Sequence, residues 1–443
     1  MTLKSAVAAA FAAGAICGWF LLAVWPSNAA DDVTRLDDLA RLKATFRRPA
    51  TLPFPADNPF SEKKRALGEA LFNDARLSSN GKLACASCHQ FAKGLSDGRA
   101  RSKGVPGRPL GRHTPTLWNV GFAVHVFWDG RARSLEEQIV NPIQANDEMA
   151  QPLGALIEKL SADEETKRAF AGAFPEDPNV TEKNLAKAIA TFLRTLVSPV
   201  TRFDRWIEGT GNLRADEISG FRIFTGKAGC VNCHSGFAFT DYAFHDIGLP
   251  DDDRGRGAIL RLAAAEHSFK TPSLREIGRR APYMHSGSLA TIDDVLRHYE
   301  KGVTARPTLS ADLHKRLDLT GEERRNLIAF LATLTSDNPR AGPAPMTAGV
   351  APPLPPASSV NVITQHEKKF SPIHVALHAG DRLWFLNNDT RTHNIRVFHP
   401  DLDFDSGAQE PGETVEIAFP DSGSFLVFCG IHPKMELNVD VAR

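Results

Sequence analysis

The chain has 443 residues and carries 52 Lys or Arg against 52 Asp or Glu, so its formal net charge at neutral pH is zero. That length is enough for two or three domains with their own cores. The balanced charge excludes recruitment of nucleic acid or an anionic membrane by a net positive field. Of the six cysteines, four stand in two repeated motifs, Cys17 lies in the N-terminal apolar segment, and Cys429 remains. No pair is therefore left for a structural disulfide.

Residues 1–30 predict an export segment. One cation, Lys4, precedes an apolar run that ends at Trp25 and the small residues Ser27 to Ala30, which is the layout of a secretory signal peptide. The apolar run is nearly long enough to cross a bilayer, so an uncleaved N-terminal anchor is the alternative. In either case we expect the rest of the chain to be exported to the bacterial periplasm, with membrane contact only if the segment stays uncleaved.

Apolar residues at helical spacing predict a mainly α-helical region with long loops. Ser61 has the side chain of an N-cap before the apolar stripe from Ala66 to Phe72. Thr320 and Glu323 form a capping-box pair at the start of another helix. Further helical patterns lie at 134–140, 153–160, 182–197 and 214–224.

One pentapeptide motif occurs twice, as Cys85-Ala86-Ser87-Cys88-His89 and as Cys230-Val231-Asn232-Cys233-His234. Cys-x-x-Cys-His is the attachment signature of a c-type haem, in which two thiols bind the haem covalently and the histidine ligates the iron. A single copy could instead be a thiol redox motif. Two copies inside a duplicated segment predict two covalently bound haems c.

The duplication is visible between the two motifs. Thr114-Pro115-Thr116-Leu117 aligns with Thr271-Pro272-Ser273-Leu274 at an offset of 157, and at the same offset Gly130 meets Gly287. The two halves are therefore interpreted as duplicated haem domains, and equivalent positions that differ mark where their roles diverge.

Two such differences stand out. Trp128 corresponds to His285, and Pro142 corresponds to Tyr299. A tyrosine phenolate can bind haem iron, whereas proline has no side-chain donor. If this position faces the iron in both halves, the second haem has a sixth protein ligand and the first is open.

The periodicity changes after a proline-rich stretch at 339–359, which predicts a linker. Short strand-like runs follow at 360–363, 373–377, 382–386, 395–398, 414–419, 424–428 and 436–441. Seven or eight strands of this length predict a β-sandwich. We therefore expect a multidomain protein: residues 1–30 the export segment, 31–200 and 201–338 two mainly α-helical c-type haem domains, 339–359 the linker, and 360–443 an all-β domain.

The all-β domain holds a set of metal-ligating side chains. Cys429, His432 and Met435 lie close together near the end of the chain, and His393 stands earlier in the domain. Two imidazoles, a thiolate and a weak thioether are the ligands of a blue copper electron-transfer site; the alternative is a buried free cysteine with unrelated histidines and a core methionine. The stretch from Val360 to Arg443 resembles the cupredoxins, and its short Cys–His–Met loop is most similar to that of amicyanins. The resemblance implies one type 1 copper bound by those four residues.

The preceding region, from Pro59 to Thr335, resembles the bacterial diheme cytochrome c peroxidases and their relative MauG. The likeness rests on the two haem motifs and on the blocks between and after them: Thr114-Pro115, Phe127-Trp128-Asp129-Gly130-Arg131, Asn141-Pro142-Ile143-Gln144 with Glu148-Met149, Phe269-Lys270-Thr271-Pro272-Ser273-Leu274 and Ala281-Pro282-Tyr283-Met284-His285.

The resemblance implies that the haem bound by His89 reacts with peroxide and that the haem bound by His234 stores or relays electrons. It places the family's distal acid at Glu148, near Gln138 and Pro142, where a carboxylate can move the peroxide proton. It places a relay tryptophan between the haems at Trp128. Without the resemblance, Glu148 would be interpreted as a solvated carboxylate and Trp128 as a core residue.

Three positions depart from the common peroxidase pattern. Peroxidases of this family have methionine as sixth ligand of the second haem, whereas MauG has tyrosine, which Tyr299 matches; Met284 is the rival ligand. No counterpart of a distal histidine is found between Phe91 and Arg112, so the first haem is expected to be open. His113 replaces the asparagine with which the family often binds calcium, and imidazole is a poor calcium ligand, so calcium is in doubt.

The sequence therefore predicts an oxidoreductase of the cytochrome c peroxidase type, which reduces hydrogen peroxide to water with electrons relayed through the second haem and the fused copper domain. One alternative is a MauG-like oxidase that modifies residues of a partner protein, and a second is a multi-centre electron carrier without catalysis. The expected partners are hydrogen peroxide and either an external periplasmic electron donor, such as a small cytochrome or cupredoxin, or a protein substrate; no nucleic acid is expected.

Overall fold

A computed structural model describes residues 39–313, 316–338, 344, 346–350, 357–399, 401–432 and 434–442. The predicted export segment at 1–30 and most of the predicted linker lie outside these residues. Residues 45–443 form one compact unit, and the sites described below all lie within it. Within the described part of the chain, no helix is both long and apolar enough to cross a membrane.

The first haem half is helical, as its sequence predicts. Ser61 caps its first long helix by accepting a hydrogen bond at Oγ from the Lys64 N–H at 3.2 Å, and Ser134 caps the helix that carries Pro142. The helix Glu164–Ala173 was not predicted from the sequence. The α-helices of this half are α2 (Glu62–Phe72), α3 (Cys85–Cys88), α4 (Leu135–Gln144), α5 (Leu153–Ser161), α6 (Glu164–Ala173) and α7 (Glu182–Arg194).

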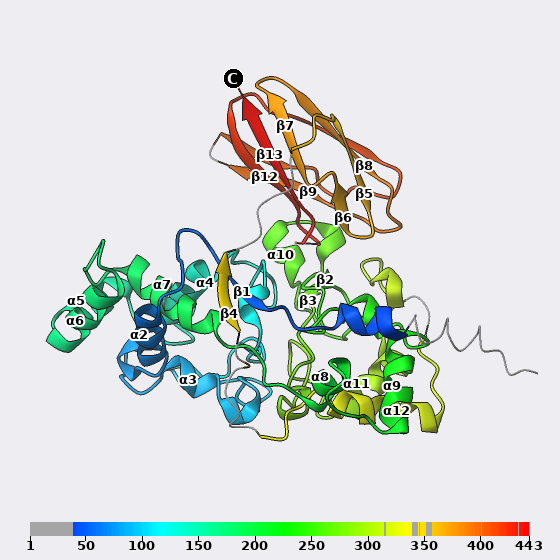
Figure 1. The fold of residues 1–443 in the computed structure, drawn as a ribbon, viewed down its shortest axis with the longest axis horizontal. Helices are drawn as coiled ribbons and strands as arrows, with labels where there is room; N and C mark the ends of the chain where they lie inside the picture. Colours follow the sequence, from blue (N-terminus) through cyan, green and yellow to red (C-terminus); the bar gives the residue numbers. More distant parts are fainter. Residues whose placement is uncertain are drawn as a thin grey trace, which may run out of the picture. The chain divides into compact units, whose positions relative to one another are not determined.

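The second haem half is also helical, with longer irregular loops (Figure 1). Thr320 and Glu323 make the predicted capping box, and a pair of two-residue strands, Phe244–His245 and Phe269–Lys270, lies between the helices. The helices are α8 (Arg202–Ile207), α9 (Ala215–Thr225), α10 (Arg256–Leu260), α11 (Ile292–Arg297), the π-helix η7 (His298–Gly302) and α12 (Gly321–Ala332).

The internal repeat reappears in the backbone. The 3₁₀ helices η3 (Val120–Phe122) and η6 (Ile277–Arg279) stand 157 residues apart. So do the isolated bridges Val126 to Ala132 and Tyr283 to Leu289. The left-handed backbone at Gly130 and Gly287 keeps the same offset. Duplicated sequence has therefore folded into duplicated turns.

Part of the predicted linker is a strand. Thr347–Val350 (β4) pairs in parallel with Thr51–Phe54 (β1), with Thr51 opposite Thr347. The strand was not expected in a proline-rich stretch, because its regular structure depends on a partner almost 300 residues earlier rather than on its own composition.

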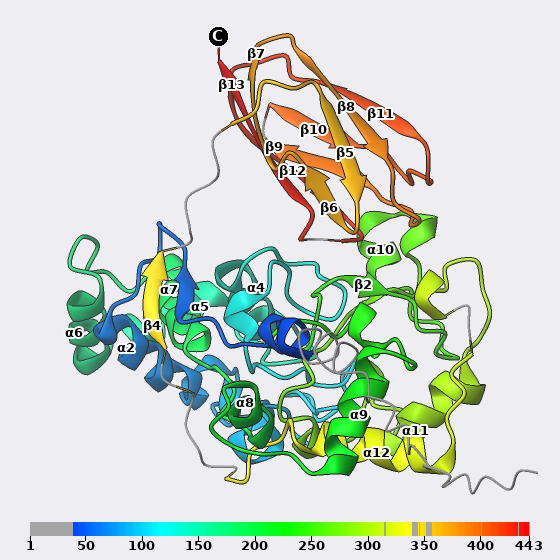
Figure 2. The same ribbon diagram turned by 45° about the vertical axis from the view of Figure 1, so that its right-hand side comes forward.

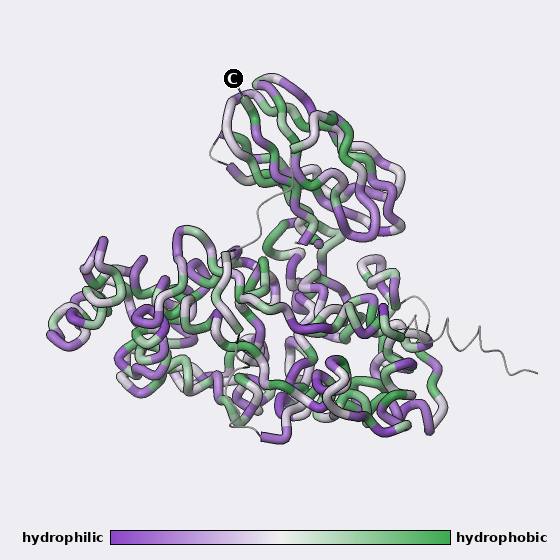
Figure 3. The backbone as a smooth tube through the Cα atoms, in the orientation of Figure 1, coloured by the Kyte–Doolittle hydropathy of each residue, from purple (hydrophilic) through white to green (hydrophobic). Residues whose placement is uncertain are grey.

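The C-terminal region is a β-sandwich of nine strands among the described residues, against the seven or eight predicted. Alternate residues of its strands are buried, for example in the pattern along β8, and Figure 3 shows the corresponding alternation of hydrophobic and hydrophilic residues. Buried side chains of both sheets form one core. The two sheets, visible in Figure 2, have the strand orders β10-β9-β12-β13-β7 and β11-β8-β5-β6.

Seven of these strands fall on the predicted runs, and β6 and β10 were missed because both are short. The strands are β5 (Val362–His366), β6 (Lys369–Ser371), β7 (His374–His378), β8 (Arg382–Asn387), β9 (Ile395–His399), β10 (Leu402–Asp405), β11 (Thr414–Ala418), β12 (Gly423–Cys429) and β13 (Glu436–Ala442).

Candidate haem and copper sites

The first haem motif forms a single helical turn. Cys85 and Cys88 begin and end α3, and His89 follows as its C-cap. The His89 ring donates a hydrogen bond from Nδ1 to the Leu95 carbonyl oxygen at 3.0 Å, so Nε2 is the nitrogen left for a metal. Iron-ligating histidines are oriented in this way by a backbone acceptor on the far ring nitrogen.

The second motif repeats this arrangement. Cys230 begins the 3₁₀ turn η4 (Cys230–Asn232), and His234 donates from Nδ1 to the Phe239 carbonyl oxygen at 2.9 Å. Leu95 and Phe239, the two acceptors, both have positive φ angles, 59° and 52°. Both motifs therefore present a histidine whose Nε2 is left to bind the haem iron.

A cavity of about 1010 Å³ reaches from one motif to the other. Its wall includes His89 from the first motif and His234 from the second. Buried cations also line it: burial lowers the pKa of Lys270 to about 8, and Arg280 keeps Nε without a hydrogen-bond partner within the described chain. Unpaired buried cations are costly unless an anion approaches them, and the carboxylates of haem are such anions. The cavity and its cations therefore fit the haems that the motifs predict.

Glu148, Gln138 and Pro142 gather at one part of this cavity. All three line it, with Gln138 and Pro142 on α4 and Glu148 in the turn that follows. The backbone of Glu148 is fixed because its carbonyl oxygen accepts a hydrogen bond from the Val105 N–H at 2.7 Å. Burial, and secondarily the neighbouring Asp147 carboxylate, raise the pKa of Glu148 above its usual range. The structure thus brings together an acid of raised pKa and a residue with no side-chain donor.

Trp128 lies buried between the two halves. Its Nε1–H donates to the His113 carbonyl oxygen at 2.8 Å, and the His113 N–H donates to the His285 carbonyl oxygen at 2.7 Å. The Trp128 and His285 rings have centroids 6.4 Å apart, and the His285 ring stacks on Phe269 at 3.5 Å. The two residues that differ between the halves, Trp128 and His285, are therefore neighbours across the pseudo-repeat.

Tyr299 lies on the π-helix η7 and lines the same cavity. Burial, with smaller contributions from Cys233 and Cys230, raises the pKa of Tyr299, so the phenol ionises only beside a positive charge. Cys230 and Cys233 of the second motif line this cavity together with Tyr299. Met284 also lines the cavity, and the choice between the two as iron ligand remains a prediction.

His113, at the expected calcium position, is occupied by protein partners. Its Nδ1 donates to the Arg99 carbonyl oxygen at 2.7 Å, and Nε2 lies 3.2 Å from the Ser96 hydroxyl. Both ring nitrogens are thus engaged, so this side chain offers neither a calcium ligand nor a distal iron ligand.

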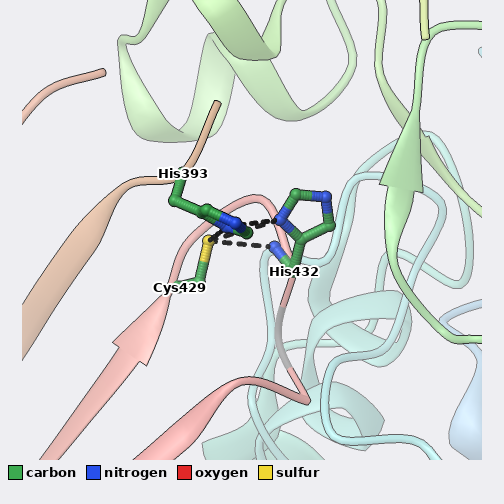
Figure 4. A group of neighbouring side chains, drawn as sticks. All are labelled: His393, Cys429 and His432. Atoms are coloured by element: carbon green, nitrogen blue, oxygen red, sulfur yellow. Dashed lines mark hydrogen bonds between the residues drawn. The ribbon is translucent and has the colours of Figure 1, made fainter. Parts of the chain in front are cut away.

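Three predicted copper ligands converge at one end of the sandwich (Figure 4). The Cys429 Sγ lies 3.6 Å from His393 Nδ1 and 3.6 Å from His432 Nδ1, and the two nitrogens are 3.0 Å apart. This triangle has room for an ion at metal–nitrogen bond lengths of about 2.0–2.1 Å. Cys429 ends β12, His432 follows in the loop to β13, and His393 precedes β9.

The surroundings of these ligands fit a metal rather than a chance cluster. His393 contacts the Asp389 carboxylate through Nε2 at 3.2 Å, which fixes Nδ1 toward the cysteine. The His432 N–H donates to the Cys429 sulfur at 3.3 Å. Met435 is fully buried, and its backbone bonds both Cys429 and His432. The position of the Met435 thioether as a weak ligand remains a prediction.

Sequence reasoning missed how the haem region touches the copper ligands. His245, from the short strand before α10, lies with its ring centroid 6.3 Å from that of His432. Arg256 donates from Nε to the Gly430 carbonyl oxygen at 2.9 Å, and the Phe244 N–H donates to the Ile431 carbonyl oxygen at 3.2 Å. No periodicity or motif marks these residues, because their role depends on a surface more than 170 residues away.

Comparisons with known proteins agree with the haem geometry. The family described as "Di-haem cytochrome c peroxidase" matches residues 62–212. The chain is 44% identical over 279 residues to "Methylamine utilization protein MauG" of Methylorubrum extorquens, covering 62% of this chain and 79% of the relative.

Two further relatives give the same picture. The chain is 33% identical over 291 residues to "Cytochrome c551 peroxidase" of Pseudomonas aeruginosa, covering 63% of this chain and 81% of that protein. Among solved structures, a MauG-like protein associated with microbial copper homeostasis superposes on this chain with a TM-score of 0.61 and 33% sequence identity. The superposition covers 66% of this chain and 94% of that protein's chain.

Proposed function

We propose that this chain, which belongs to the diheme cytochrome c peroxidase and MauG family, reduces hydrogen peroxide to water at the first haem. The relatives named cytochrome c peroxidase are oxidoreductases that act on hydrogen peroxide. In this proposal, electrons reach the first haem from the second haem, and the second haem receives them from copper in the fused sandwich. The signal-like residues 1–30 support a periplasmic location.

The observation that carries this proposal is the group formed by Glu148, Gln138 and Pro142 in the cavity wall. When bound, the first haem supplies an iron that exchanges electrons with peroxide. Glu148, as carboxylate, takes a proton from one peroxide oxygen and returns it to the other as the O–O bond breaks. Overall, one peroxide, two protons and two electrons give two waters. A pure electron carrier has no use for an acid of raised pKa in this position.

The proposal assigns the other centres to named residues. His234 and Tyr299 would ligate the second haem, and an anionic oxygen ligand favours the higher oxidation states of iron. Trp128 lies between the halves and provides an aromatic ring between them. His393, Cys429, His432 and Met435 would hold copper, a one-electron carrier in this ligand set. Fusion keeps this donor at an effective concentration of about millimolar.

The test is stopped-flow absorbance on protein carrying both haems and copper, with copper reduced and both haems ferric, mixed with one equivalent of hydrogen peroxide. We expect the blue copper band to appear as the haem spectrum recovers by one of its two oxidising equivalents, because one peroxide takes two electrons and a single Cu⁺ supplies one. If the haem spectrum changes and stays changed while copper remains reduced, copper is not the donor. If the haem spectrum does not change, the first iron is not open and the chain is a carrier.

A second candidate function rests on Tyr299. MauG is named among the relatives for methylamine utilization, and the sequence resemblance to MauG implies that Tyr299 would be a ligand of the second haem. Such a protein would oxidise residues of a partner protein, with the copper domain as a docking or electron-accepting module. Persistence of the oxidised haem spectrum in the experiment above would favour this function over the peroxidase.

A further inference from the structure

The copper-ligand segment of the sandwich is covered by the haem region of the same chain. His432 is 5% exposed and Ile431 is 7% exposed, although both lie in the loop between β12 and β13. Arg256 and Phe244 hold the backbone of this loop through the two hydrogen bonds described above. The His432 edge of the predicted copper site is therefore in contact with the diheme part of the chain.

Two further groups of contacts fix this docking. Lys368 of the sandwich pairs with Asp241 at 3.1 Å and also donates to the Asn232 carbonyl oxygen at 3.3 Å, so it contacts one residue inside the second haem motif and one residue after it. Arg391 pairs with Asp312 at 2.8 Å. All of these partners belong to the second haem half.

His245 is placed between the second haem motif and the copper ligands. Its imidazole nitrogen, the Cys233 sulfur and an Asp241 carboxylate oxygen all lie within 4.8 Å of one another, and Nε2 is 2.9 Å from Asp241. Its other neighbour is the His432 ring, at a centroid distance of 6.3 Å. His245 itself is only 7% exposed.

The first haem half reaches the copper segment differently. His125 contacts the Phe428 ring at a centroid distance of 6.0 Å, and the Arg133 guanidinium lies 5.4 Å from the same ring. Phe428 is not one of the predicted copper ligands. Of the described contacts, the one through His245 joins a cysteine that carries haem to a histidine that binds metal.

We propose that His245 is the relay residue through which the second haem and the copper site exchange electrons, along the order Cys233, His245, His432. The proposal rests on the copper relay proposed above and specifies its path. Each passage moves one electron, so Cu⁺ becomes Cu²⁺ as the iron of the second haem is reduced by one electron, and no bond is made or broken at His245. Electron tunnelling is faster along such a path, because it runs through covalent bonds and neighbouring rings rather than across empty space.

The test compares two substitutions that both remove the bond to Asp241. His245→Leu removes the aromatic ring, and His245→Phe keeps one. In protein carrying haems and copper, an electron is injected by pulse radiolysis and its equilibration between haem and copper is followed at the blue copper band. We expect H245L to slow the transfer by an order of magnitude or more, H245F to slow it less, and the control H125L to leave it unchanged. Equal rates in wild type, H245L and H245F would overturn the proposal.

Docking is measured separately, in copper-free protein, by amide hydrogen exchange of the Phe428–His432 segment. Lys368→Met removes the ion pair between the sandwich and Asp241; it keeps the His245 ring but also changes the surroundings of the Asp241 oxygen that His245 contacts. The two variants are compared under conditions in which their hydrogen exchange in this segment is equal. If electron transfer is then equally slow in K368M and H245L, His245 acts only through docking and the relay is overturned. If electron transfer is slower in H245L than in K368M, the relay is supported. Absence of any haem–copper transfer in the wild type, with an intact blue band, would instead reject the copper relay itself.

Discussion

The two haem halves repeat several turns of the backbone and differ in side chains at equivalent positions. Both orient their proximal histidine by a bond from Nδ1 to a backbone carbonyl, and both place a glycine of positive φ at the same step of the repeat. The first half continues as the regular helix α4 through Pro142, whereas the second changes from α11 to a π-helix that carries Tyr299. The wider π turn, a feature common at functional sites, accompanies the gain of a potential iron ligand.

The turns around the two proximal histidines are therefore conserved between the halves, whereas the residues expected on the opposite side of each haem differ. One half combines Pro142 with an acid, and the other offers a phenol. The following experiments test this difference between the halves, in decreasing order of expected effect.

Replacing Glu148 removes the acid from the first half. We expect Glu148→Gln to lower the rate of reaction with hydrogen peroxide by about 10²–10⁴-fold, because a positioned general acid–base contributes that much. The rate is measured by stopped-flow absorbance of the haems. Glu137→Gln is the matched control, because it makes the same change at an exposed position of α4 that does not line the cavity, and it should retain most of the rate. An unchanged rate in E148Q would remove Glu148 from the mechanism.

Replacing Tyr299 makes the second half resemble the ordinary peroxidases. We expect Tyr299→Met to raise the reduction potential of the second haem by ~0.1 V or more, because a thioether favours the reduced iron that a phenolate disfavours. Spectroelectrochemical titration separates the two haems, and the potential of the first should not move. A shift in Met284→Leu with none in Y299M would assign the ligand to Met284 instead.

The glycines of the repeat test how the halves pack against each other. A Cβ added at Gly130 would lie 2.1 Å from the Phe244 ring of the second half. Gly107 has a similar φ, 76°, but nothing within 4 Å. We expect Gly107→Ala to cost about 1–2 kcal/mol from backbone conformation alone, and Gly130→Ala to cost ~1–3 kcal/mol more from overpacking.

Thermal unfolding monitored at the haems checks this difference. Both variants have the same covalent change and the same backbone strain, so their difference isolates the contact across the two halves. Equal unfolding midpoints for G107A and G130A would show that the ring of Phe244 moves aside without cost.

The smallest effect concerns pH. Glu148 must be ionised to take a proton, so activity is present above its pKa and is lost as pH falls through it. Asp147 raises this pKa and Arg131 lowers it. We therefore expect Asp147→Asn to move the acidic limb of the pH–rate profile for peroxide to lower pH, and Arg131→Gln to move it to higher pH. Shifts in the same direction for both would show that another group controls the limb.

Much of this molecule could be predicted because its signals are local. The Ser61 and Thr320 caps lie beside the helices they begin, and the alternation along the strands identified the sandwich. The repeat at a fixed offset correctly indicated shared turns at Gly130 and Gly287. These features depend on residues close in sequence or on identical copies of them.

What escaped prediction depends on distant partners. The strand Thr347–Val350 exists by pairing with Thr51–Phe54, and its own proline-rich surroundings indicate only a linker. Arg256 and His245 carry no motif, and their importance arises from docking against Gly430 and His432. Three of the four predicted copper ligands, Cys429, His432 and Met435, share one short loop that marks them in the sequence, whereas the residues that cover this loop carry no such signal.

The pairing of β4 with β1 also limits which proteins can share the copper face. Because Val350 is fixed on the haem region, only about seven peptide units separate it from Ala357, where the sandwich begins, a reach of roughly 25 Å at full extension. A folded domain of about 100 residues has a radius of gyration of about 13 Å, so a visiting protein and the haem region cannot occupy the His432 edge together. An outside redox partner that uses this edge therefore competes sterically with the chain's own haem region, and the two contact copper in turn.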